Sequence, residues 1–72
     1  MDIKLKKTLK MQLEPELEIM ALVAQGKTNE AIAKEVFVSV HTVKAHVAKV
    51  LRILDAKDRT QAVYKLTKLG LI

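Results

Sequence analysis

The chain contains no cysteine among its 72 residues. This absence excludes disulfide bonds, thiolate-bound metal ions and cysteine nucleophiles, and it agrees with a reducing compartment. Long hydrophobic runs are also missing: no stretch approaches the roughly 18 consecutive apolar residues of a membrane span, and the opening MDIKLKK lacks the apolar region of an export signal. We therefore expect a soluble, cytoplasmic protein that does not enter a membrane.

Residues with the spacing of a metal or catalytic site are also absent. His41 and His46 are five residues apart, about 140° around a helix, so they cannot bind one ion as an i, i+4 pair does. No base and orienting carboxylate accompany the hydroxyl groups of Ser39, Thr42 and Thr60, and no glycine-rich loop is present to bind phosphate. The sequence predicts no enzyme, no metal site and no cofactor.

The positive charge is concentrated in the second half of the chain. The net charge is +5, and residues 39–72 carry seven cations against two carboxylates, whereas residues 13–38 carry two cations against five. A polyanion is the natural partner for a region with such a charge. A chain of this length has a small core, so self-association would add stability.

Residues 40–54 are predicted to form an amphipathic helix with Ser39 as its N-cap. A helical wheel places an apolar stripe on one face, consisting of Val43, Val47, Val50, Leu51 and Leu54. The opposite face has no carboxylate and consists of His41, Thr42, Lys44, Ala45, Ala48, Lys49 and Arg52. A basic helix of this kind, preceded by a second short helix, is suited to a DNA groove.

Two helices are predicted before this one. The first should begin near Pro15, because proline is favoured at the first helical position, and end at Gly26. The second should follow the N-cap Thr28 and run to about Glu35. We expect Phe37, the only phenylalanine, to fill the core.

The last predicted helix runs from about Arg59 to Leu69. Asp58 and Gln61 have the spacing of a capping box, and Gly70 stands where a C-terminal glycine is favoured. The helix carries an apolar stripe of Ala62, Val63, Leu66 and Leu69. Part of this stripe should pack on the core, and the remainder is a candidate subunit contact.

Residues 1–12 alternate lysine with aliphatic residues and show no clear cap or turn. We interpret them as an extended basic arm or linker that precedes a domain formed by residues 13–72. A weaker interpretation treats this basic segment as a membrane-surface anchor.

Three separated motifs resemble the LuxR/GerE-type helix-turn-helix domain. They are GKTNEAIA at residues 26–33, S-x-x-TVK-x-HV at residues 39–47 and RTQAV at residues 59–63. All three occur in the family's order and spacing, and the resemblance covers about residues 13–72. It implies an all-α fold of four helices that contains a helix-turn-helix, and it implies double-stranded DNA as the partner.

The resemblance also implies roles for individual residues. The helix over residues 40–54 would be the recognition helix in the major groove, with base-edge contacts from Lys44, Ala45 and Ala48. Contacts to the DNA backbone would come from Thr28, Asn29, Thr42, His46 and Lys49, and the position of Arg52 at the edge of the face adds it to this set. The last helix is the family's usual dimer contact, so we expect a homodimer that binds through Ala62, Val63, Leu66 and Leu69.

The family resemblance leaves the whole protein's organisation open. Such domains usually form the effector end of response regulators or quorum-sensing regulators in a longer chain with an upstream receiver or ligand-binding domain, and some are freestanding. Region 4 of sigma factors is a neighbouring resemblance, but the TVK-x-H motif favours the LuxR type. The alternative function is a protein interaction or dimerisation module that is derived from a helix-turn-helix and lacks specific DNA binding.

Overall fold

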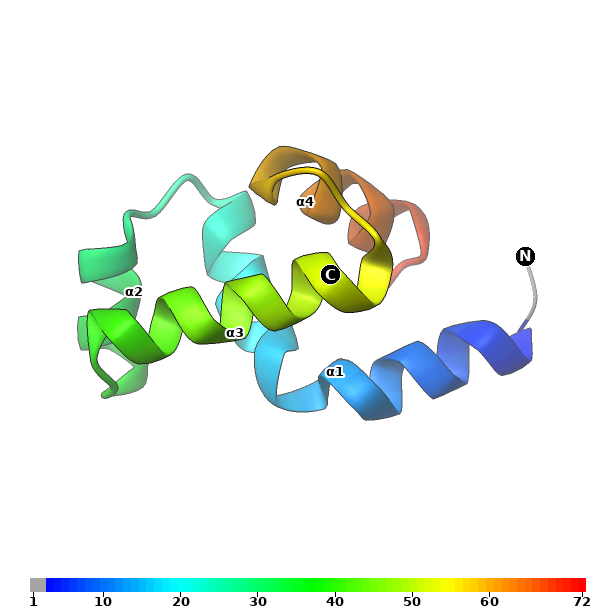
Figure 1. The fold of residues 1–72 in the computed structure, drawn as a ribbon, viewed down its shortest axis with the longest axis horizontal. Coiled ribbons are helices and arrows are strands. Elements are labelled where there is room, and N and C mark those ends of the chain that lie inside the picture. Colours follow the sequence, from blue (N-terminus) through cyan, green and yellow to red (C-terminus); the bar gives the residue numbers. More distant parts are fainter. Residues whose placement is uncertain (1–2) are drawn as a thin grey trace.

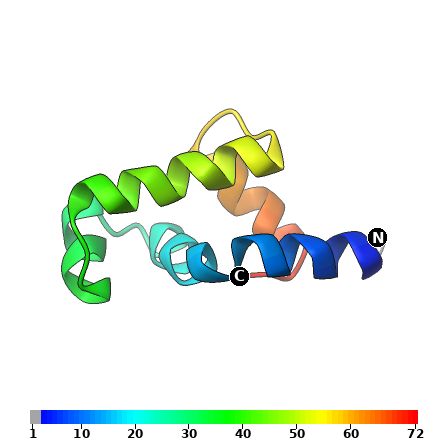
Figure 2. The same ribbon diagram turned by 60° about the horizontal axis from the view of Figure 1, so that its bottom comes forward.

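The computed structural model describes residues 3–72, and this part of the chain forms four helices and no strand. The helices are α1 (Ile3–Ala24), α2 (Asn29–Val36), α3 (Val40–Leu54) and α4 (Arg59–Lys68). Figure 1 shows α3 crossing in front of α1, and Figure 2 shows these two helices in separate layers, with α4 between them and α2 at the end where α3 begins. The predicted all-α, four-helix fold is confirmed. None of the helices in the described residues is long and apolar enough to span a bilayer.

All four helices contribute to a single hydrophobic core, to which α3 gives the largest share. The predicted stripe of α3 faces inward, since four of its five residues are buried and Leu51 packs against them at the edge. The buried apolar residues are Leu13, Ile19, Met20, Ile32, Ala33, Val43, Val47, Val50, Leu54, Ala62 and Leu66. Burying one face of α3 in this way leaves its opposite face directed to solvent.

α1 begins much earlier than the sequence predicts. It starts at Ile3, so the extended arm predicted for residues 1–12 and the helix start predicted near Pro15 are both wrong. The physical reason is tertiary packing: Leu9 packs against the core, and Leu13, one helical turn later, is fully buried. An apolar stripe with this spacing stabilises a helix where local end signals are weak. Met1 and Asp2, the first two residues of the predicted arm, lie outside the described residues.

Pro15 lies in the interior of α1. Because proline has no N–H, it cannot donate to the carbonyl of Met11, and its ring crowds that carbonyl. Figure 1 shows α1 bending in its light-blue middle part, as expected for an internal proline. The first half of α1 lies near the C-terminal end of the chain, where the ammonium group of Lys6 is beside Gly70.

The three predicted N-caps are confirmed. Thr28, Ser39 and Asp58 each have extended backbone angles and precede α2, α3 and α4. The side-chain oxygens accept hydrogen bonds from the backbone N–H groups three residues later, at 3.1, 3.0 and 2.8 Å respectively. Such caps satisfy N–H groups that have no partner within the helix, so these three helix starts are encoded locally.

The end of α4 also follows the prediction. Gly70 has a φ of +73°, a conformation that is costly for residues with a Cβ. The N–H of Leu71 donates to the carbonyl of Leu66 at 2.9 Å, the long-range bond of a Schellman motif.

The prediction that Phe37 fills the core is wrong. Phe37 is 91% exposed and has a φ of +60°. Its N–H donates to the carbonyl of Ala33, so it occupies the left-handed position at which α2 ends and the chain reverses toward α3. This reversal turns the side chain to solvent, and the core beneath α2 is filled by Ile32 and Ala33.

Candidate nucleic-acid interface

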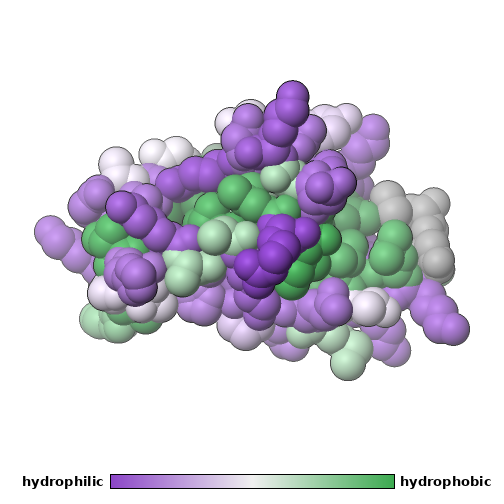
Figure 3. All heavy atoms as spheres, viewed as in Figure 1, coloured by the Kyte–Doolittle hydropathy of each residue, from purple (hydrophilic) through white to green (hydrophobic). Residues whose placement is uncertain are grey.

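The strongest candidate site is the solvent-facing side of α3, which we call the exposed α3 face. It consists of His41, Lys44, Ala45, Ala48 and Arg52, all of which are exposed. α3 contains no carboxylate. Figure 3 looks onto this side of the molecule and shows strongly hydrophilic residues beside weakly hydrophobic ones over α3. The face therefore combines basic groups with small side chains that permit a close approach to a surface.

One flank of α3 is turned toward α1 and meets a buried carboxylate. Glu16 is 1% exposed. Its Oε2 lies 2.7 Å from Nδ1 of His46, and its Oε1 accepts a hydrogen bond from Nζ of Lys49 at 3.1 Å. The side chains of His46 and Lys49 are 31% and 36% exposed. Two of the predicted backbone-binding residues are thus held against α1 in the free protein.

Thr42, another predicted backbone-binding residue, belongs to the N-terminal cap of α3. The hydroxyl of Ser39 donates to Oγ1 of Thr42 at 3.0 Å, while the N–H of Thr42 donates to Oγ of Ser39. Because the Thr42 oxygen accepts from Ser39, its own hydroxyl hydrogen remains available to an external acceptor.

The remaining predicted backbone contacts lie at the start of α2, where α4 reaches them. Oγ1 of Thr28 accepts from the N–H of Ala31, and Oδ1 of Asn29 accepts from Nη1 of Arg59 at 2.6 Å. A guanidinium group can only donate, so this bond orients the Asn29 amide with its NH₂ group away from Arg59. An NH₂ group with this orientation can donate to a phosphate.

Sequence reasoning missed the roles of Glu16 and Arg59. Arg59 has a local signal: it is a cation in the first turn of α4, where the helix dipole disfavours positive charge, which indicates a partner elsewhere. Glu16 has no such signal, because its partners are 30 and 33 residues away.

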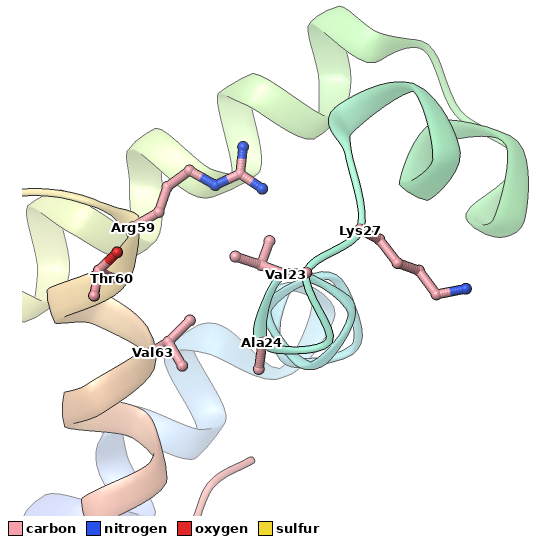
Figure 4. A pocket seen from close by; sticks show the side chains of 7 residues that line it. Val23, Ala24, Lys27, Arg59, Thr60 and Val63 are labelled. Atoms are coloured by element: carbon pink, nitrogen blue, oxygen red, sulfur yellow. The ribbon is translucent and has the colours of Figure 1, made fainter.

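An open cavity of about 440 Å³ lies between the end of α1 and the start of α4. Its lining mixes aliphatic and basic side chains and consists of Val23, Ala24, Gly26, Lys27, Arg59, Thr60 and Val63. Figure 4 shows Arg59 extending along one edge of this cavity and Lys27 pointing away from it. Val63, one of the predicted dimer residues, is therefore accessible beside this cavity.

The predicted dimer contact on α4 needs correction. Ala62 and Leu66 are completely buried within their own protomer, so in this fold they cannot touch a partner. Val63 and Leu69 are only partly covered. Tyr64 is 60% exposed, with its ring 5.5 Å from the Lys68 ammonium group. The accessible surface of α4 is therefore narrower and more polar than the sequence stripe indicates.

Comparison with known proteins agrees with this geometry. The family described as bacterial regulatory proteins, luxR family, matches residues 14–66. The chain is 53% identical over 47 residues to the transcriptional regulatory protein LiaR of Bacillus subtilis, covering 65% of this chain and 22% of LiaR. It is 45% identical over 53 residues to the response regulator protein VraR of Staphylococcus aureus, covering 74% of this chain and 25% of VraR. The matched part of the chain thus spans about a quarter of the length of these relatives.

Proposed function

Because the chain belongs to the luxR family of bacterial regulatory proteins, we propose that it regulates transcription by binding specific sequences in duplex DNA. The observation that carries this proposal is the exposed α3 face, which is basic, contains no carboxylate and lies opposite a completely apolar buried stripe. The N-terminal cap of α3 and its packing on the core hold this helix rigidly, as insertion into a major groove requires.

The residues of the exposed α3 face divide into two kinds of DNA contact. Lys44 can donate to O6 and N7 of guanine, and the methyl groups of Ala45 and Ala48 can approach thymine methyl groups closely. Arg52 lies at the edge of the face, where it would meet phosphates together with Thr42, Thr28 and Asn29. Base-edge contacts supply specificity, and phosphate contacts supply affinity that depends on salt.

We further propose that the protein binds DNA as a homodimer through the accessible part of α4. Val63 and Leu69 are the predicted contact residues that remain partly exposed. Two copies related by a twofold axis would place two α3 helices on half-sites about one helical turn apart. A dimer doubles the number of base contacts, which matters for a recognition helix with two central alanines.

The position of this domain in a longer regulator is also a proposal. The relatives are about four times longer than the matched segment and include response regulators. By analogy, we propose that in a longer parent chain a receiver or ligand-binding domain would precede α1, and that the protein acts in the cytoplasm.

Selection of bound sequences from random duplex DNA at a stated salt concentration tests the proposal. The expected result is an enriched motif with two inverted half-sites. If no motif is enriched and binding is equally weak for all sequences, the protein is not a specific reader of DNA.

One observation favours a second candidate, a protein interaction module without specific DNA binding. His46 and Lys49, two groups that would face DNA, are bound to Glu16 instead. Analytical ultracentrifugation that shows a stable dimer, together with the absence of salt-dependent DNA affinity, would support this alternative.

A further inference from the structure

Glu16 is the only buried charged side chain in residues 3–72, and the contacts proposed for DNA binding do not use it. Its two carboxylate oxygens have separate partners, Nδ1 of His46 and Nζ of Lys49. Both partners lie on the same flank of α3. One carboxylate from α1 therefore holds two side chains of the proposed recognition helix.

The burial of the Glu16 carboxylate explains why it has two partners. A buried carboxylate loses its hydration, so it needs opposite charge and hydrogen-bond donors nearby. Lys49 supplies the charge, and its ammonium group is therefore drawn toward α1 at 3.1 Å. His46 supplies the second donor, so its Nδ1 carries a hydrogen and its Nε2 is the ring nitrogen left for other partners.

We infer that Glu16 is a positioning residue that withholds the charge of Lys49 from the DNA phosphates and fixes the orientation of the His46 ring. This inference rests on the proposed function. It predicts that Lys49 adds little to the sequence-independent part of the affinity, so that discrimination depends more on the base contacts of Lys44. The buried carboxylate would thus raise specificity by lowering non-specific binding.

The decisive variant is Glu16→Gln, which keeps the shape of the side chain and one acceptor oxygen but removes the charge and replaces the second acceptor oxygen with an NH₂ donor. Glu18→Gln is the matched control, because Glu18 lies on the same helix, is exposed, and makes none of the contacts described between α1 and α3. Both variants change the net charge of the protein by the same amount. Only Glu16→Gln should release Lys49.

The measurement is DNA affinity as a function of salt between 50 and 200 mM, on the selected site and on a scrambled duplex. For Glu16→Gln we expect the slope of log K against log salt to steepen by roughly one, because one more phosphate is neutralised. Non-specific affinity should rise about threefold to tenfold at the low-salt end, and the ratio of specific to non-specific affinity should fall. Glu18→Gln should leave the slope and the ratio unchanged.

Lys49→Gln provides a second test, and its arm in the native background does not depend on the stability of the Glu16 variant. In the native background we expect Lys49→Gln to leave the salt slope unchanged. In the Glu16→Gln background we expect it to reduce the slope by about one, back to the native value. A decrease of about one in the native background would show that Lys49 already contacts phosphate, and the inference would be wrong.

The possible failures can be told apart. If the native protein binds DNA and the salt slopes of Glu16→Gln and Glu18→Gln are equal, the inference about Glu16 fails and the proposed function stands. If the native protein has no salt-dependent DNA affinity, the proposed function fails, and the inference fails with it. Nitrogen NMR of the His46 ring in the free protein tests the contact with Glu16 independently of DNA binding. If this contact fixes the ring, Nδ1 should be the protonated nitrogen in the native protein.

Discussion

At the scale of single residues, Lys44 is the side chain on which specificity should depend most. It is exposed on α3, and its side chain forms no hydrogen bond or ion pair within residues 3–72. Lys44→Ala should weaken binding to the selected site by about 1–3 kcal/mol and relax the preference for one base. Fluorescence anisotropy on selected and scrambled duplexes measures this change. Lys57→Ala, which removes an exposed cation outside α3, is the control. If Lys44→Ala loses the same affinity on both duplexes, Lys44 contacts phosphates and not bases.

Phe37 gives a residue-scale prediction about stability. Its φ of +60° is unfavourable for a bulky residue, and its exposed ring gains little from packing. Asparagine tolerates this conformation, so Phe37→Asn should increase the free energy of unfolding by about 0.5–1 kcal/mol. Urea denaturation measures this difference. Val38→Asn, next to it but without a positive φ, should not stabilise the protein; a loss of stability in Phe37→Asn would show that the ring has a structural contact.

At the scale of helices, the structure shows which boundaries depend on local sequence. The starts of α2, α3 and α4 could be predicted because each depends on a side chain and an N–H group three residues apart. The start of α1 could not, because it depends on Leu9 packing against distant parts of the chain, and Pro15 has the appearance of a start signal. The same limit applies to the site: the wheel identified the exposed α3 face, but the contacts of Glu16 span about half the sequence.

The cap of α4 can be tested directly. Asp58→Ala removes the oxygen that accepts from the N–H of Gln61, and it should lower the free energy of unfolding by about 0.5–2 kcal/mol. Asp58→Asn keeps an acceptor at the same position, so thermal unfolding should show it close to the native protein. If both variants unfold at the native temperature, the cap contributes little to the stability of α4.

At the scale of the whole molecule, single substitutions can separate the packing of α4 on the core from the dimer contact that we propose for it. Its buried residues, Ala62 and Leu66, hold the domain together, whereas Val63 is only partly covered and lies beside the cavity at the end of α1. Val63→Glu should therefore leave the domain folded, because the carboxylate can reach water. It should still disrupt a twofold contact, since two copies would bring two carboxylates of like charge together at the contact.

The expected consequence for DNA binding distinguishes a dimer contact from a general defect. Val63→Glu should keep the native affinity for a DNA duplex with one half-site and lose the additional affinity for two correctly spaced half-sites. Titrations of both duplexes, with circular dichroism to confirm the fold, measure this difference. Thr67→Glu, an exposed position on the same helix, is the control for the added charge. If Val63→Glu binds two half-sites as tightly as the native protein does, the two copies meet through another surface, and the twofold arrangement proposed for α4 is wrong.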